Sequence, residues 1–335
     1  MAALGLAALV AACSSSALPH SLADGDYWHL IGSLSEPAGR FDVSDNLVSN
    51  EAMFVENVRR LRADAGVYIG VGPEQNFSYI ARVRPAMAFI VDIRRDNLSL
   101  HLLYKALFEL SDDRADFVSR LFSRPRPERL GPSSTVGDIF ETFETVTPSQ
   151  ALYERTLASV RDRLTTTRQM PMNEEDLAAI ERALTAFRTD GPAIDFWRGR
   201  PKDPEALRPS YRQLMTARDV TGASRSFLAT EDAFAFVKAL HTRNMIVPVV
   251  GDFGGPMAIR GIGAYVRARG GVVQTFYTSN VSVYLSKDQT RAFCASLATL
   301  PVAPRATFVD RDDVRPFADR LATCRSDPSV TFQRQ

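Results

Sequence analysis

The sequence predicts an α/β fold in three layers, with helices on both faces of a mainly parallel sheet. The first observation is an apolar segment at 66–70, which runs into the glycine turn Gly70-Val71-Gly72-Pro73 and then a helix. The second is Met87–Asp92, a continuous apolar run typical of a parallel strand buried on both faces. A similar order of strands and helices returns after Thr230. Alternation of this kind indicates parallel strands joined by helices.

The first part of the predicted domain covers residues 27–110. It is expected to be irregular over 27–51, and Ser49 or Asn50 is expected to cap the next helix. The strand at 66–70 follows, and Pro73 suits the first position of a helix. The strand at 87–92 leads into another helix that ends near residue 110.

Residues 111–226 differ in pattern from what precedes and follows them. Proline, glycine and polar turns separate several helical pieces there, so we expect a mostly helical insertion. The second part of the domain covers 227–330. It holds an apolar strand at 245–250, a helix opened by Pro256 and a second strand at 272–277. A helix, a strand and a closing helix complete it.

Composition limits the classes of function. The 335 residues are 45% apolar and 24% charged, which is enough for an ordinary buried core. The formal net charge of +1 argues against nucleic-acid binding, because that function rests on many cations facing phosphates.

The N-terminus predicts export and a membrane anchor. Residues 2–12 are apolar but too short to span a bilayer. They end Leu9-Val10-Ala11-Ala12-Cys13, which resembles a bacterial lipobox whose cysteine is lipidated. Residues 1–13 would then be a signal peptide and 14–26 a tether at the cell envelope. The usual positive charge near Met1 is absent, so an apolar N-terminus of a cytoplasmic protein is the alternative.

Cysteine usage agrees with export. If Cys13 carries lipid, Cys294 and Cys324 are left as an even pair in an oxidising compartment. They are expected to form a disulfide, and the alternative is two unrelated thiols. His and Cys spacings do not match a metal site, so no metal is expected.

Polar clusters follow each of the four best-defined strands. They lie at Gly70–Asn76, at Asp92, at Gly251-Asp252 and at Tyr277–Asn280. In an open parallel sheet, ligands bind beyond the carboxyl ends of the strands. We therefore expect these clusters to meet in one ligand crevice.

The first cluster predicts the closest contacts with a ligand. Gly70 and Gly72 would let the backbone approach it, and Glu74 and Asn76 stand at the helix start where amides can bind a polar group. Asp92 lies about twenty residues after the first glycine, a spacing at which a carboxylate accepts hydrogen bonds from ribose hydroxyls. The alternative is a tight turn and a solvated carboxylate.

These motifs resemble the first two motifs of class I methyltransferases that use S-adenosylmethionine. Residues 245–277 are similar to the fourth and fifth strands of that family. The resemblance implies a Rossmann-like core with the cofactor held at the first two motifs. The residues expected to contact the ligand are Gly70, Gly72, Glu74, Asn76 and Asp92, with Asp252 and Asn280 closing the site. Asp252 would then be the candidate catalytic residue. The loop lacks a third glycine, and no Asn/Asp-Pro-Pro-Tyr signature accompanies Asp252.

The whole chain also resembles an uncharacterised family of bacterial exported proteins or lipoproteins. The resemblance rests on 33–37, 45–51, 70–76 and 246–253. It implies a fold and no activity.

A dense polar segment precedes the first predicted helix. Asp45, Asn46, Asn50 and Glu51 would either fold over the mouth of the crevice or serve as helix caps and turns. Ser49 is expected to be a helix cap.

Three functions follow from these patterns. The first is a lipid-anchored envelope protein with a methyltransferase-like fold that binds a small nucleoside-like ligand. The second is an active methyltransferase that uses S-adenosylmethionine. The third is a scaffold for a protein partner, whose identity the sequence does not specify. Serine-hydrolase GxSxG, HExxH and Walker motifs are absent from the sequence.

Overall fold

The computed structural model describes residues 17–41, 46–198 and 208–327. In this part of the chain six strands pair into one sheet. Their bounds are β1 Val67–Val71, β2 Met87–Asp92, β3 Ile246–Val250, β4 Val273–Ser279, β5 Val302–Asp310 and β6 Val314–Pro316.

The strands lie in the order β3-β2-β1-β4-β5-β6. The first five are parallel to their neighbours, and β6 runs antiparallel to β5. The predicted α/β fold with a mainly parallel sheet is therefore confirmed. Residues 245–277, compared above with fourth and fifth strands, supply the third and fourth strands of this chain.

The burial of each strand matches its place in the sheet. Every residue of β2 and β3 is buried, as are the first four of β1. Pro248 lies in the middle of β3, where a missing N–H would break the ladder of an interior strand. Because β3 is the outermost strand, it pairs only with β2 and tolerates the proline.

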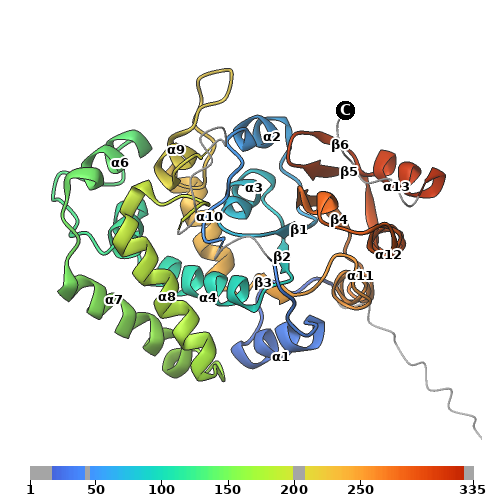
Figure 1. The fold of residues 1–335 in the computed structure, drawn as a ribbon, viewed down its shortest axis with the longest axis horizontal. Coiled ribbons are helices and arrows are strands. Elements are labelled where there is room, and N and C mark those ends of the chain that lie inside the picture. Colours follow the sequence, from blue (N-terminus) through green and yellow to red (C-terminus); the bar gives the residue numbers. More distant parts are fainter. Residues whose placement is uncertain (1–16, 42–45, 199–207, 328–335) are drawn as a thin grey trace, which may run out of the picture.

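Helices cover both faces of the sheet (Figure 1). The helices that lie before β3 in the chain are α1 Asp24–Leu34, α2 Phe54–Arg60, α3 Gln75–Val83, α4 Arg95–Leu110, α5 Arg114–Phe122, α6 Val136–Thr145, α7 Gln150–Asp162, α8 Glu174–Asp190, α9 Tyr211–Thr216 and α10 Glu231–Thr242. Those after β3 are α11 Ala258–Ala268, α12 Lys287–Leu297 and α13 Phe317–Ser326.

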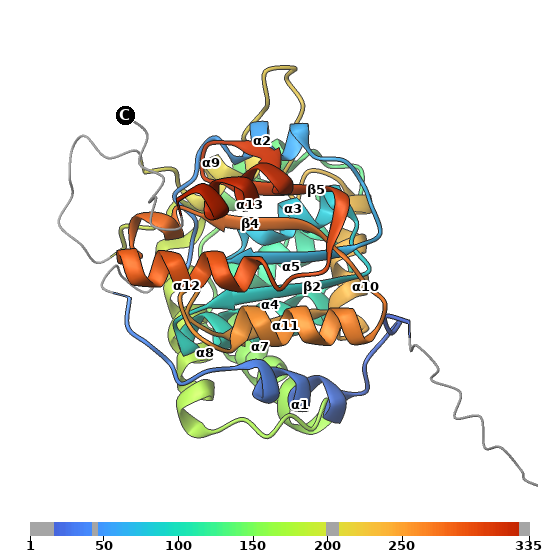
Figure 2. The same cartoon turned by 90° about the vertical axis from the view of Figure 1, so that its right-hand side faces the viewer.

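The described residues also contain three short helices of other types. They are the π-helical η1 Arg163–Thr167 and the 3-10 helices η2 Gly191–Ala193 and η3 Val281–Val283. Figure 2 shows α11, α12 and α13 in front of the strands and α3, α4, α5 and α8 behind them. The segment between β2 and β3 is helical throughout its described elements, and α7 and α8 lie outside α4 (Figure 1).

The expectation of an irregular segment at 27–51 is wrong for its first part. Helix α1 begins at Asp24, and it buries Tyr27, Leu30, Ile31 and Leu34. This is the i, i+3, i+4, i+7 pattern of an amphipathic helix. Its N-cap residue, Ala23, makes no side-chain cap, so the usual sequence signal for a helix start is missing.

The expected helix cap at Ser49 or Asn50 is also wrong. Helix α2 begins at Phe54, after a cap position at Met53 that makes no side-chain hydrogen bond. Ser49 instead bonds into the protein interior, as described below. A long-range polar partner therefore overrides the local capping preference.

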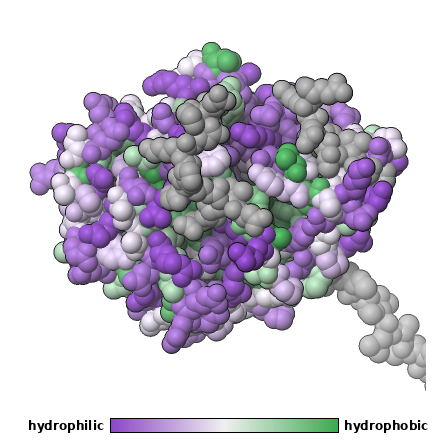
Figure 3. All heavy atoms as spheres, viewed as in Figure 1, coloured by the Kyte–Doolittle hydropathy of each residue, from purple (hydrophilic) through white to green (hydrophobic). Residues whose placement is uncertain are grey.

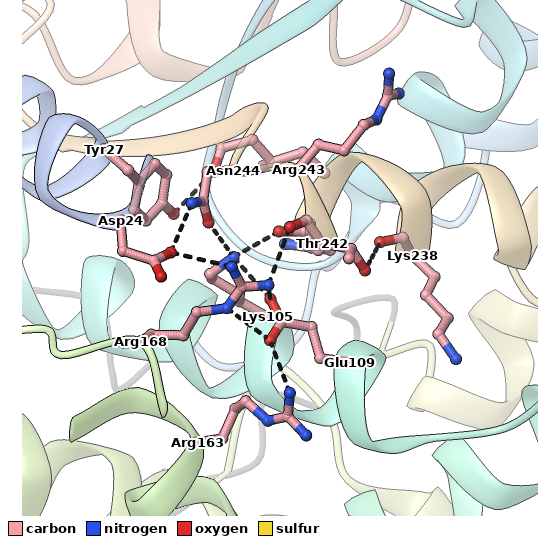
Figure 4. Close-up of polar contacts among 12 residues, drawn as sticks. Asp24, Tyr27, Lys105, Glu109, Arg163, Arg168, Lys238, Thr242, Arg243 and Asn244 are labelled. Carbon is pink, nitrogen blue, oxygen red and sulfur yellow. Dashed lines mark hydrogen bonds and ion pairs between the residues drawn. The ribbon is translucent and has the colours of Figure 1, made fainter. Parts of the chain in front are cut away.

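A buried polar cluster fixes the amino end of β3 (Figure 4). The Lys105 ammonium donates to Glu109 at 2.8 Å and to Asn244 Oδ1, and its side chain is only 1% exposed. Arg168 holds the same Glu109 carboxylate with two nitrogens, at 3.0 and 3.2 Å. A buried charge is tolerated when it is paired in this way.

The same cluster reaches the N-terminal helix. Asp24 accepts from Arg168 at 3.0 Å and from Asn244 Nδ2 at 2.8 Å, while the Tyr27 hydroxyl donates to the Ile246 carbonyl at 3.0 Å. These contacts tie α1 to α4, to the segment after η1 and to the turn before β3 (Figure 4). The end of the sheet opposite the candidate site is thus closed by side chains already paired with one another.

Cys294 and Cys324 form a disulfide with a Cα–Cα distance of 5.4 Å. It joins α12 to α13, the last helix of the described chain. The predicted lipidation site Cys13 and the proposed cover residue Asp45 lie outside the described residues.

We expect the disulfide to stabilise the fold by restricting the unfolded chain. Replacing both cysteines by serine should lower the free energy of unfolding by about 3.6 kcal/mol for a loop closed across a sequence separation of 30. Urea denaturation measures this change. Dithiothreitol should destabilise the wild type by a similar amount and leave the double variant unaffected. Equal stability of the two oxidised proteins would contradict the prediction.

Candidate functional site

A cavity of about 410 Å³ lies at the carboxyl ends of the strands. Val71 of β1, Asp92 of β2 and Ser279 of β4 line it, together with Gly251 directly after β3. It is located where β1 and β4 are neighbours, although the chain connects β1 to β2 and β3 to β4. This reversal of strand order is where open α/β sheets bind ligands.

The structure brings together six of the residues selected from the sequence. Gly72, Asp92, Asp252 and Asn280 line the cavity, and so do Asn46 and Asn50. Gly72 has a φ of +76°, which favours glycine, and a Cβ built there would meet no atom within 4 Å. The polar tips of four strands therefore meet in one crevice.

Gly70, Glu74 and Asn76 are not among the lining residues. Asn76 is fully buried, and its Nδ2 donates to the three loop carbonyls at 71–73 at distances of 2.8–3.1 Å. A Cβ on Gly70 would lie 2.0 Å from Asn76 Oδ1. Gly70 is thus a glycine because Asn76 packs against it, and Asn76 shapes the loop from behind.

Glu74 also points away from the cavity. Its carboxyl oxygens accept from the Ser49 N–H at 3.2 and 3.3 Å, and the side chain is fully buried. Burial raises the pKa of Glu74 to about 8. Glu74 therefore does not line the ligand site, as the sequence predicted for it at the helix start. It links the loop after β1 to the segment before α2.

Glu51 forms the centre of a polar network behind the cavity wall. It accepts from the Ser279 hydroxyl with one oxygen and from Gln75 Nε2, at 2.8 Å, with the other. Gln75 Oε1 accepts in turn from the Ser49 hydroxyl, and Gln75 Nε2 lies 3.2 Å from the Tyr277 oxygen. Ser49, Tyr277 and Ser279 line the cavity, whereas Glu51 is buried behind them.

Asp92 is held by a neighbouring cation. Its Oδ1 accepts from the Arg94 N–H at 2.9 Å and from Nε at 3.1 Å, and its Oδ2 accepts from Nη2 at 3.1 Å. A carboxylate has about four acceptor positions, so it retains capacity for a ligand hydroxyl. Because Arg94 neutralises the charge, the position suits a neutral hydroxyl better than a second cation.

Asp252 is fixed by protein contacts on both oxygens. One accepts from the Gly254 N–H at 2.8 Å and the other from Gln289 Nε2 at 3.2 Å. The start of α11 beside it is capped by Glu36, which accepts from the N–H groups of Met257 and Ala258 at 2.7 and 2.8 Å. The protein's own carboxylate therefore occupies the anion-binding end of that helix.

Sequence reasoning missed much of the outer wall. Arg40, Phe41 and Tyr284 line it, and the rings of Phe41 and Tyr284 pack edge to face at 5.0 Å between centroids. Phe253, by contrast, was among the aromatic residues that the sequence offered for a pocket wall, and it does line the cavity. Aromatic residues in polar loops could have indicated a ligand-binding wall. Phe41 and Tyr284 lie more than two hundred residues apart, however, so the sequence does not show that they meet.

The sequence matches one family. The profile described as "Domain of unknown function (DUF7790)" covers residues 47–311. The chain belongs to the DUF7790 family. The matched range includes every strand tip that lines the cavity, while Arg40, Phe41 and Asn46 lie before it. No curated protein matches the chain.

Among the described residues, no group of three or more His, Cys, Asp or Glu side chains is placed to hold a metal ion. The side chains that line the cavity carry hydroxyl, amide, carboxylate, guanidinium and aromatic groups.

We expect Glu74 to make stability depend on pH. Its pKa is about 8 in the folded protein and 4.5 ordinarily, so between these values the unfolded chain releases a proton that the folded chain keeps. The free energy of unfolding should then fall as pH rises from about 4.5 to about 8. Relative to wild type, Glu74→Gln should gain up to about 5 kcal/mol across that range.

Chemical denaturation at a series of pH values measures this difference. Glu128→Gln is the matched control, because Glu128 is exposed on the surface. Its profile should run parallel to that of the wild type. A parallel profile for Glu74→Gln as well would contradict the assignment of a buried, protonated Glu74.

Proposed function

We propose that this DUF7790 protein binds a small nucleoside-like ligand in the cavity at the carboxyl ends of its strands. The observation that carries the proposal is the convergence of Gly72, Asp92, Asp252 and Asn280 on one cavity of about 410 Å³. Ligand pockets have volumes of roughly 300–1,000 Å³ and combine apolar walls with a few placed polar groups.

The lining favours a ligand with an aromatic ring and hydroxyl groups. Phe41, Phe253 and Tyr284 offer ring faces or edges for a base, and Asp92 retains an acceptor position for a ligand hydroxyl. Arg40 is the one cation among the described lining residues. A single cation suits a nucleoside better than a polyphosphate, which needs several.

A specific observation supports an active methyltransferase as the second candidate. The order β3-β2-β1-β4-β5 followed by an antiparallel strand supports a Rossmann-like core of the methyltransferase type. The open approach at Gly72 and the position of Asp92 fit S-adenosylmethionine, which would supply the methyl group. Gly72 and Asp92 would hold it, with Asp252 near the reacting group.

A protein-binding scaffold is less favoured. Hydrophilic residues dominate the face shown in Figure 3, and hydrophobic residues appear there in small separate groups. Protein interfaces usually have a more continuous apolar centre. The cavity at the carboxyl ends of the strands is the better-supported recognition element.

We also propose that the protein is anchored to the cell envelope through lipid on Cys13. In the described part of the chain, none of the helices is both long and apolar enough to cross a bilayer. Membrane fractionation of the wild type and Cys13→Ala tests the anchor. Recovery of both proteins in the soluble fraction would favour the cytoplasmic alternative.

We expect nucleosides to raise the melting temperature of the wild-type protein. Binding stabilises the folded state by about 2.7 kcal/mol when the ligand is at a hundred times its Kd. Asp92→Ala should lose the shift, because the variant lacks the acceptors for the ligand hydroxyls. Asp96→Ala should keep it, because Asp96 is exposed on α4. Adenosine, uridine and S-adenosylhomocysteine form the screen.

The screen separates the two candidates. A shift with S-adenosylhomocysteine alone would favour the methyltransferase, and a shift with adenosine or uridine would favour a nucleoside-binding protein. An equal melting-temperature shift in Asp92→Ala and wild type would show that the ligand does not bind the Asp92 carboxylate.

A further inference from the structure

Ser279 is the last residue of β4 and lies in the cavity wall with an unusual backbone conformation. Its φ is +51°, in the left-handed region that residues other than glycine rarely adopt. The 3-10 helix η3 begins two residues later. A serine in a cavity wall, on a strained turn between a strand and a helix, resembles the geometry of a nucleophile elbow.

The hydroxyl has a carboxylate as its acceptor. Ser279 Oγ donates to Glu51 Oε1, and Glu51 is only 3% exposed. The side-chain hydrogen-bond partners of Glu51 are the neutral groups of Ser279, Gln75 and Tyr277 rather than a cation. A buried carboxylate with neutral partners binds a proton more readily than one in a salt bridge.

A third group orients the carboxylate. Gln75 Nε2 donates to Glu51 Oε2 at 2.8 Å, and the Glu51 N–H donates to Ser49 Oγ at 3.2 Å. Gln75 is in turn fixed by the Ser49 hydroxyl. A nucleophile, a base within hydrogen-bond reach and a group that orients the base are the three parts shared by activated serine sites.

We propose that Ser279 is a nucleophile, that Glu51 is its general base and that the site acts on carboxylic esters. Val281 and Leu285, which lie after Asn280 in the cavity wall, would contact the apolar acyl part. Both proposals concern the same cavity, but they depend on different side chains, because Asp92 ends β2 and Ser279 ends β4.

The reaction balances with water as the co-reactant. Ser279 Oγ forms a bond to the ester carbonyl carbon, and its proton passes to Glu51. The bond between that carbon and the alcohol oxygen breaks, and the proton from Glu51 goes to the departing alcohol. Water then attacks the acyl-serine with Glu51 again as base, releasing the carboxylic acid and restoring the Ser279 hydroxyl.

The glycines that usually flank a nucleophilic serine are absent, since the sequence reads Thr278-Ser279-Asn280. The arrangement is therefore visible only in three dimensions. Glu51 precedes Ser279 by 228 positions in the chain.

A fluorophosphonate probe tests the proposal on the intact protein. Ser279 Oγ would form a bond to phosphorus, fluoride would leave, and Glu51 would receive the proton. Mass spectrometry should find one label per chain, on the peptide that contains Ser279. Ser279→Gly should abolish labelling, and glycine suits the positive φ of that position. Ser123→Gly is the matched control, because Ser123 has a φ of +52° away from the cavity.

The base is tested by Glu51→Gln, which keeps hydrogen-bonding groups but accepts no proton. Labelling of Ser279 should slow by about 100-fold or more, the usual contribution of a general base.

In the wild type the rate of labelling should fall as pH is lowered and Glu51 becomes protonated. Burial raises the pKa of Glu51, with smaller opposing effects from hydrogen bonds. The ionisable groups that influence or respond to Glu51 are Glu74, Tyr68, Tyr79, Tyr277 and Arg311.

The outcomes are separable. No label on Ser279, or the same labelling rate in folded Glu51→Gln, overturns the proposal. If Glu51→Gln fails to fold, a wild-type labelling rate independent of pH overturns it instead. Asp92→Ala should keep the label while losing the nucleoside shift, so the two proposals can fail independently. Hydrolysis of p-nitrophenyl acetate by the wild type but not by Ser279→Gly would extend the result to an ester.

Discussion

The parallel alignment of β1 to β4 is the constraint on which the candidate site depends. Backbone hydrogen bonds fix the register of these strands, and nearly all their residues are buried between helices. Parallel strands in register end at the same edge of the sheet. The loops that follow them must therefore meet, although they come from opposite ends of the chain.

The cavity wall is stiffened by polar groups that do not face the cavity. Asn76 holds the β1 loop from behind, Glu74 binds the backbone at Ser49, and Gln75 joins Ser49 to Glu51. These three consecutive residues of one helix start thus connect the loop after β1 to the segment before α2. The buried side chains of Glu74, Gln75 and Asn76 thus all have hydrogen-bond partners, which offsets the cost of removing them from water.

This network also explains why the segment at 46–51 lies at the site. Apolar contacts alone would allow a short loop to slide, whereas directional hydrogen bonds to buried side chains fix one arrangement. Ser49 and Asn50 consequently face the cavity while Glu51 turns inward. Near Asp252, directional hydrogen bonds fix the backbone in a similar way, because Glu36 caps the start of α11.

The sequence was sufficient to predict the α/β fold class, the positions of β1 to β4 and the meeting of their polar tips. These features follow from local hydrophobic patterns and from the geometry of parallel sheets, which act over short stretches of chain. The sequence failed at α1, where no capping residue marks the start, and at β6, a three-residue strand formed by pairing with β5.

The division of roles among the selected residues was decided only by tertiary structure. From local pattern, four residues were predicted alike to contact the ligand: Gly72, Glu74, Asn76 and Asp92. Packing places Gly72 and Asp92 at the cavity and buries Glu74 and Asn76 behind it. The contact of Ser279 with Glu51 joins residues 228 positions apart, and no local signal encodes it. Sequence periodicity records which face of an element is buried, whereas the partner of a buried polar side chain depends on which distant segment packs there.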